Sequence, residues 1–208
     1  MALQAITLSV DPAFAGDTGQ SALSDAGCAF CGAPAGHWAE PGYLPCGGSV
    51  RTVAAACPLC ALPQHLERPR IDEEAALVWL PEISQAALNA TMREIHIAIQ
   101  AVGEDVHADA VFRKRSAGLG TLYYARAVLA QRSAPAVARV GTASPRELGL
   151  ALLELSSVAY ASRAQLLGGL RLMPLGRFFQ GEHDVYPEIV RFWRDSAATA
   201  ATRLSGAL

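Results

Sequence analysis

Two short cysteine motifs constrain this chain more than any other feature of its sequence. They are Cys28-Ala29-Phe30-Cys31 and Cys57-Pro58-Leu59-Cys60, and 25 residues separate them. Cysteines at this spacing suit a tight turn whose backbone N–H groups can face the sulfur atoms, and Gly32 suits the sharp turn after the first motif. Two such turns supply four thiolates, the donor set of a closed structural zinc site. The sequence therefore predicts one structural zinc ion bound by Cys28, Cys31, Cys57 and Cys60.

The other interpretations of these motifs are a thioredoxin-like dithiol and two unrelated, redox-inert pairs. A redox dithiol belongs in a βαβ context, which neither motif has. Closing the loop between the motifs costs about 3–4 kcal/mol of chain entropy. Binding of a structural zinc ion releases about 10–16 kcal/mol, so a metal ion can hold the loop closed. Four sulfurs fill the metal's shell, so the fifth cysteine, Cys46, is expected to be dispensable.

Charge and targeting signals limit the location of the protein and its partners. The net charge of −2 gives no basic footprint for nucleic acid and no polybasic anchor for a membrane. Residues 1–10 lack the basic and apolar parts of a signal peptide. The apolar run at residues 148–160 contains Glu154 and is too short to span a membrane. We therefore expect a cytoplasmic protein, in which disulfides are rare and metal ligation by the cysteines is favoured.

The hydrophobic pattern predicts an α+β fold. Residues 1–80 form an N-terminal region with a β-compatible run at 6–10, the zinc-stapled segment 28–68 and a short buried strand at 75–80. Residues 81–208 form a mainly helical region. The two regions are expected to pack as one compact domain, because a chain of this length can bury a sizeable core. The Gly- and Pro-rich zinc segment is the part that most needs a metal ion to hold it together.

The helical region is predicted to begin with two helices. Ser84 can cap a helix that runs to about residue 102. Its apolar positions recur at spacings of four and three, as Leu88, Met92, Ile95, Ile99 and Val102. The next helix is predicted over about residues 107–131, with a break near Gly118 and Gly120.

Two further helices are predicted after a connector at residues 131–139. Ser144-Pro145-Arg146-Glu147 combines an N-cap serine, a proline at the first helical position and a capping-box glutamate. The apolar stripe of this helix is Leu148, Leu152, Leu155 and Ala159. The last helix is predicted over about residues 187–204, with Asp184 or Tyr186 near its cap. One face of it carries Ile189, Trp193 and Ala197.

The cysteine motifs, with a glycine after the first, are similar to those that staple the treble clef of many HNH endonucleases. Such enzymes add histidine and asparagine residues that hold a catalytic metal ion. Here His37 comes too early between the motifs, and residues 51–56 contain no asparagine. His65 follows the second motif, but one histidine cannot hold a catalytic metal ion alone, and Pro63 disturbs the helix there. The expectation is an HNH-like treble-clef zinc region without catalytic residues.

Four other patterns are better explained by structure than by a site. His96 lies beside the first helical stripe and is expected to pack there. Asp72-Glu73-Glu74 and Arg113-Lys114-Arg115 are expected to be solvated, although the basic run could contact an acidic partner or a phosphate. Gly118-Leu119-Gly120 is no phosphate loop, because no Gly-Lys-Ser/Thr follows.

Four segments carry a resemblance to a known family. They are CAFCGAPA at 28–35, CPLC at 57–60, LVWLPEISQAALN at 77–89 and LRLMPLGRF at 170–178, followed by a helix with Trp193. In this order, over about residues 28–195, the chain resembles the IcmJ/DotN family of the type IVB (Dot/Icm) secretion coupling complex. The LPEISQAALN element is the most specific part, and residues 69–77 diverge.

The resemblance implies an HNH-like treble clef with one zinc ion on the four cysteines Cys28, Cys31, Cys57 and Cys60, and no nuclease role. It also implies partners: the cytoplasmic tail of the coupling ATPase, which recruits effectors, and other subunits of the secretion system. The chain would then lie at the inner membrane through its partner. A related conjugation system is equally compatible with the sequence.

Three functions remain open on the sequence. The first is a non-catalytic scaffold or adaptor, for which we expect neither a small-molecule substrate nor nucleic acid. The others are a divergent HNH-type metal-dependent nuclease and a non-catalytic nucleic-acid-binding zinc module. The missing catalytic residues count against the nuclease, and the net acidity counts against the module. A scaffold predicts that some large aromatic residues are exposed as a peptide groove, drawn from Trp79, Tyr123, Tyr124, Phe178, Phe179 and Trp193.

Overall fold

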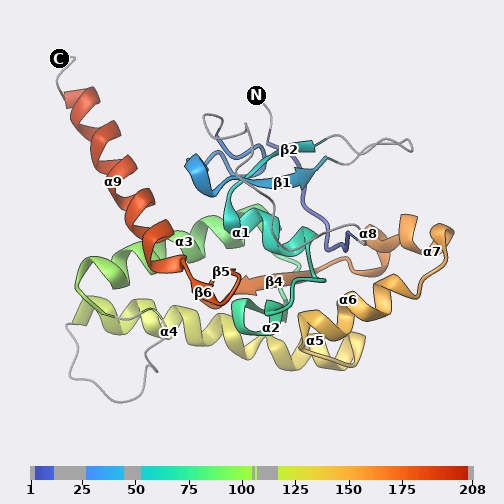
Figure 1. The fold of residues 1–208 in the computed structure, drawn as a ribbon. Helices are drawn as coiled ribbons and strands as arrows, with labels where there is room; N and C mark the ends of the chain where they lie inside the picture. Colours follow the sequence, from blue (N-terminus) through green and yellow to red (C-terminus); the bar gives the residue numbers. More distant parts are fainter. Residues whose placement is uncertain (1–2, 12–26, 45–52, 105, 107–116, 206–208) are drawn as a thin grey trace.

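Short antiparallel strand pairs at the centre of the molecule are surrounded by helices of very different lengths (Figure 1). The computed structural model describes residues 3–11, 27–44, 53–104, 106 and 117–205. Within these residues the strands form three separate pairs: β1 (Glu40–Tyr43) with β2 (Val53–Ala56), β3 (Ala75–Trp79) with β4 (Leu170–Pro174), and β5 (Phe179–Gln180) with β6 (His183–Asp184). The mixture of helices with short antiparallel strands agrees with the predicted α+β class.

The helices pack around the β3–β4 pair. In chain order they are η1 (Gly36–Trp38), α1 (Pro58–Ala61), η2 (Leu62–Gln64), α2 (Ile71–Glu74), α3 (Gln85–Ala101), α4 (Ala117–Gln131), α5 (Ser133–Val140), α6 (Pro145–Leu153), α7 (Ser157–Ala161), α8 (Arg163–Leu166) and α9 (Tyr186–Ser205). Helix α3 contacts β4, α9, α4 and α1, and α5 packs on β3. Helix α3 therefore joins the cysteine region to the rest of the core.

The β3–β4 pair connects the two regions that the sequence distinguishes. Strand β3 forms where the buried strand was predicted, and its partner β4 comes from near the end of the chain, with Ala75 opposite Pro174 and Trp79 opposite Leu170. The outer edge of each strand is also hydrogen-bonded: Leu77 N–H donates to Ala143 O, and Leu172 N–H donates to Gln85 Oε1. The buried apolar side chains form one continuous cluster across both regions.

Two helix starts confirm the capping predictions. Ser84 Oγ accepts from Ala87 N–H at 3.1 Å and starts α3, and Ser144 Oγ accepts from Glu147 N–H at 3.1 Å and starts α6. At the start of α6, Thr142 links the two residues of the predicted capping box. The Thr142 hydroxyl donates to the Glu147 carboxylate and accepts from Ser144 N–H at 2.9 Å.

Several element predictions in the helical region differ from the structure. Gly118 and Gly120 lie inside α4, and the part of the predicted helix before Ala117 lies outside the described residues. Helix α5 occupies most of the predicted connector, where its Ala136 is buried. The stripe predicted from Leu148 to Ala159 stops early, because α6 ends at Leu153 and a new helix begins at Ser157. Helices α4, α5 and α6 each contact β3, and such tertiary contacts contribute most of the stability of short helices.

Three other predictions differ from the structure, each for its own reason. Val102 is 56% exposed because α3 ends at Ala101. Ala197 is exposed because α9 extends away from the body after Trp193 (Figure 1). The run at residues 6–10 is not a strand, but it packs on η2, with Ser9 N–H donating to Pro63 O and Ser9 O accepting from Leu66 N–H.

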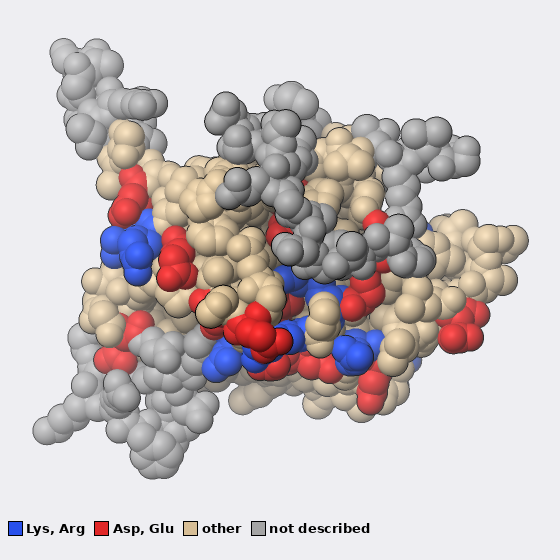
Figure 2. Space-filling model, viewed as in Figure 1, with Lys and Arg blue, Asp and Glu red and all other residues tan. Residues whose placement is uncertain are grey.

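Glu74 is buried, which corrects the prediction that the acidic run 72–74 is solvated. Its carboxylate accepts from Arg68 Nε at 2.8 Å and Nη2 at 2.9 Å, and from Phe179 N–H at 2.7 Å. This pair ties α2 to β5 inside the protein. Glu73 behaves as predicted: it is exposed and pairs with Arg70. On the face shown in Figure 2, acidic and basic side chains are intermixed.

We predict that Glu74→Gln lowers the free energy of unfolding by about 3–5 kcal/mol, because the substitution leaves the Arg68 guanidinium buried beside an uncharged amide. Glu73→Gln is the matched control and should change stability little, because that carboxylate faces solvent. Urea denaturation of both variants measures the difference. Equal stabilities for the two variants would contradict a structural role for the buried pair.

Candidate metal centre

Two backbone turns bring the four cysteines together. In the first, Gly32 N–H donates to Cys28 O at 2.9 Å, and Gly32 has a φ of 73°, which glycine adopts without strain. In the second, Cys57 precedes α1, with Pro58 at the first helical position, and its carbonyl accepts from Cys60 N–H at 2.9 Å. Ala29 N–H donates to Ala55 O and holds the first turn against β2. Each turn thus points two sulfurs toward the other turn.

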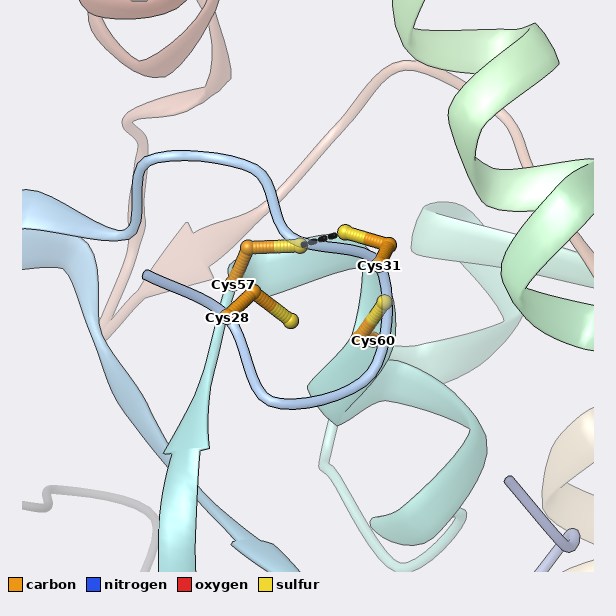
Figure 3. Close-up of side chains that lie close together, drawn as sticks. All are labelled: Cys28, Cys31, Cys57 and Cys60. Carbon is orange, nitrogen blue, oxygen red and sulfur yellow. Dashed lines mark hydrogen bonds between the residues drawn. The ribbon is translucent and has the colours of Figure 1, made fainter. Parts of the chain in front are cut away.

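The four Sγ atoms all lie within 4.8 Å of one another (Figure 3). Cys28, Cys57 and Cys60 are buried, and Cys31 is partly exposed. The Sγ atoms of Cys31 and Cys57 are 3.6 Å apart, far longer than a disulfide bond of about 2.05 Å. Sulfurs in a tetrahedral zinc site lie about 3.8 Å apart, as zinc–sulfur bonds of about 2.3 Å require. The predicted ligands Cys28, Cys31, Cys57 and Cys60 are therefore together and could hold one metal ion.

The proton balance of the cluster also fits a cation. Hydrogen bonds from the Cys31, Cys57 and Cys60 thiols hold the pKa of Cys28 well below its ordinary value. Hydrogen bonding to Cys28 and Cys31, together with burial, raises the pKa of Cys57 and Cys60 well above theirs. The raised pKa values of Cys57 and Cys60 thus oppose ionisation of all four cysteines by themselves. A divalent cation would stabilise all four thiolates and replace the shared protons.

Helix α3 supplies hydrogen-bond donors to two of the sulfurs. Asn89 Nδ2 lies 3.4 Å from Cys60 Sγ and donates to Leu59 O at 2.8 Å. Arg93 Nη1 lies 3.7 Å from Cys31 Sγ. Burial lowers the pKa of Arg93, but the Cys31 sulfur and the Glu94 carboxylate outweigh burial and raise it overall. Sequence reasoning missed both residues; the signal was a polar pair four residues apart beside the apolar stripe of α3.

His65 and His96 are used for packing and internal hydrogen bonds. His65 is fully buried, with Nδ1 2.9 Å from Glu67 Oε1 and Nε2 3.0 Å from Pro41 O. His96 is buried with Nδ1 2.6 Å from the Tyr186 hydroxyl, which fits its expected packing role. Burial raises the pKa of Tyr186, so the hydroxyl stays neutral and can donate to His96. His37 is exposed, with its ring centre 4.4 Å from that of Trp38.

The six large aromatic residues do not form an exposed groove. Tyr123, Phe178, Phe179 and Trp193 are buried in the core. Trp79 is partly buried beneath the Arg139 guanidinium, which lies 3.8 Å from the ring centre, and Tyr124 is 71% exposed. These six residues therefore do not provide the predicted peptide groove. Cys46 and the basic run 113–115 lie outside the described residues.

Comparison with known proteins returns no match, either to a protein-family model or to a curated protein. In the part of the chain that the structure describes, no helix is both long and apolar enough to cross a membrane. Among the same residues, the four cysteines are the group of Cys, His, Asp and Glu side chains that could hold a metal ion.

We predict that the purified protein contains about one equivalent of zinc per chain and that Cys57→Ser lowers the zinc content, because it removes one of four ligands. Cys46→Ser is the matched control and should keep its zinc. Elemental analysis measures the metal, and limited proteolysis should then cut the Cys57→Ser protein first within residues 28–68. Less than about half an equivalent of zinc in the wild type, or unchanged zinc in Cys57→Ser, would contradict a site of four cysteine ligands.

We predict that Arg93→Gln weakens zinc binding by about tenfold, because it removes the charged donor beside Cys31 without removing a ligand. Competition with a chromophoric chelator measures the affinity. Arg132→Gln, which changes an exposed arginine paired with Glu82, is the control and should bind zinc like the wild type. An affinity loss of the same size in both variants would show that Arg93 acts only through the overall charge.

Proposed function

We propose that this protein is a non-catalytic scaffold in which Cys28, Cys31, Cys57 and Cys60 bind one structural zinc ion within an HNH-like treble clef. We further propose that it is an adaptor subunit in the coupling complex of a type IVB secretion system or a related conjugation system. Its partner would be the cytoplasmic tail of the coupling ATPase. It would then lie at the cytoplasmic side of the inner membrane through that partner.

The observation that carries the scaffold proposal is the closed donor set of the cysteine cluster. Four converging sulfurs leave a tetrahedral metal ion no open position for water or substrate, which is the arrangement of a structural rather than a catalytic site. His65, the histidine after the second motif, already has both ring nitrogens in hydrogen bonds to Glu67 and Pro41. Both features favour a scaffold over a nuclease.

The adaptor proposal rests on the resemblance, and the segments that carry the resemblance meet in the fold. Asn89, in the LPEISQAALN element, donates to Leu59 and Cys60 of the second cysteine motif. Gln85 of the same element exchanges hydrogen bonds with the backbone of Leu172, in the LRLMPLGRF segment. Trp193 Nε1 donates to Pro34 O, at the end of the first cysteine segment, at 2.9 Å. The shared pattern is therefore one connected set of contacts around the cysteine cluster.

The surface charge disfavours the nucleic-acid alternative. On the face shown in Figure 2, basic and acidic side chains alternate instead of forming a basic stripe. Arg70 pairs with both Glu73 and Glu182, and Arg177 lies 4.0 Å from Glu73. Binding to phosphates draws its strength from uncompensated positive charge, which these pairs reduce.

We predict that the tagged protein, isolated from its native host, co-purifies with a coupling ATPase and other secretion-system subunits. Deleting the cytoplasmic tail of that ATPase should abolish the association, because the proposed contact lies there. Quantitative mass spectrometry against an untagged strain measures enrichment. A protein that purifies without any secretion-system component would contradict the adaptor proposal.

The nuclease alternative has its own test. Incubation of the zinc-loaded protein with plasmid DNA and Mg²⁺ or Mn²⁺ is expected to leave the plasmid intact. Cleavage that disappears in His65→Ala would overturn the scaffold proposal in favour of the nuclease. A salt-sensitive shift of DNA mobility without cleavage would instead favour the nucleic-acid-binding module.

A further inference from the structure

Arg171 on β4 is a partly buried guanidinium with no carboxylate partner among the described residues. Two backbone carbonyls hold it in place: Nε donates to Ile83 O at 2.8 Å, and Nη1 donates to Leu170 O at 2.8 Å. Burial lowers the pKa of Arg171, as expected for a cation that no nearby negative charge stabilises. By contrast, the buried Arg68 has the Glu74 carboxylate. Arg171 therefore presents fixed positive charge that the described part of the molecule does not use.

A small pocket opens beside this guanidinium. We name it the Arg171 pocket; its volume is about 50 Å³, and its walls include Thr7, Gln85, Ala164, Leu167, Gly168 and Arg171. A cavity needs about 10–15 Å³ to hold one water, so the pocket accommodates roughly three to five non-hydrogen atoms. That is the size of a carboxylate with its attached carbon.

The hydrogen-bond inventory of the wall favours an anion. The Gln85 amide is fully engaged with Asn89 and the backbone of Leu172. Arg171 Nη2 makes no hydrogen bond to a described residue, and neither does the Thr7 hydroxyl. The wall thus offers the Arg171 N–H and Thr7 O–H groups as donors that no described residue uses, and it carries no acidic side chain. A planar guanidinium whose orientation is fixed matches the two oxygens of a carboxylate.

Two exposed apolar side chains are close in the sequence to residues of the pocket wall. Leu166, beside the wall residue Leu167, is 64% exposed, and Val158 on the neighbouring α7 is 76% exposed. Helices α7 and α8 contain no fully buried residue. A ligand that combines a carboxylate with an adjoining apolar group would use both features, as an acidic residue flanked by leucine or a similar residue in a protein segment does.

We propose that the Arg171 pocket binds the carboxylate of an acidic side chain in a protein partner, with an apolar residue of the same segment against the exposed side chains of α8. The recognition of a carboxylate rests on the pocket alone. The identity of its carrier as a protein segment rests on the proposed adaptor function.

The test uses the full-length, zinc-loaded protein and short probes. Acetyl-Leu-Glu-Leu-amide is titrated while the Arg171 Nε–H resonance is followed by NMR, and acetyl-Leu-Gln-Leu-amide is the matched uncharged probe. Acetate and inorganic phosphate at equal ionic strength form separate arms. We expect the Glu probe to bind about tenfold more tightly than the Gln probe, the effect of one charge-assisted hydrogen bond. Binding should also weaken as salt is added.

Two variants test the site itself, with binding followed by the backbone amide resonances of the pocket wall. Arg171→Gln removes the charge, and Ala164→Leu fills the pocket from an exposed position without touching the guanidinium. Both should weaken binding of the Glu probe by about tenfold. Ala161→Leu, an exposed alanine outside the pocket wall, is the matched control and should bind normally.

Three outcomes would overturn the proposal: equal binding of the Glu and Gln probes, unchanged binding in both Arg171→Gln and Ala164→Leu, and tighter binding of phosphate than of acetate. The last would assign the pocket to a phosphate group. Because these probes are independent of the host proteins, a failure here leaves the adaptor function to be decided by co-purification.

Discussion

The convergence of four cysteine sulfurs, three of them from buried residues, is the constraint on which the rest of this structure depends. Cys28, Cys31, Cys57 and Cys60 come from two turns that have little regular structure of their own, and their sulfurs converge within 4.8 Å. Without a cation, such a cluster must keep protons on some of its thiols, as the opposed pKa shifts of Cys28 and Cys57 indicate. A bound metal ion would turn this unfavourable arrangement into the strongest local restraint in the chain.

Helix α3 connects the cysteine cluster to the remainder of the fold. One side of it presents Gln85, Asn89 and Arg93 at intervals of four residues, and these reach β4, the second cysteine turn and the Cys31 sulfur. Its apolar stripe packs in the core at the same time. The candidate metal centre and the hydrophobic core thus share a helix. Loss of the metal ion should therefore destabilise the structure at β4 as well as in the cysteine turns.

The buried arginine Arg68 and the partly buried Arg171 are stabilised in two different ways in this molecule. Arg68 and Glu74 form a two-point pair whose remaining capacity is used by the backbone of Phe179, so desolvation of each charge is offset inside the protein. Arg171 is instead held by carbonyl groups alone and faces a pocket. The described part of the fold leaves the charge of Arg171 uncompensated. Such a charge marks a candidate ligand site, because binding can supply the missing counter-charge.

The sequence by itself determined the local features: the four cysteines that could hold a metal ion, from the CxxC spacing; the starts of α3 and α6, from Ser84 and Ser144; and the buried strand β3, from its run of apolar residues. Only the tertiary structure decided which segments meet. The pairing of β3 with β4, the burial of Glu74 and the approach of Arg93 to Cys31 join residues 6 to about 100 positions apart. Periodicity reports the faces of one element, whereas the packing of α5 and α6 on β3 and the exposure of the end of α9 depend on how the elements are arranged in space.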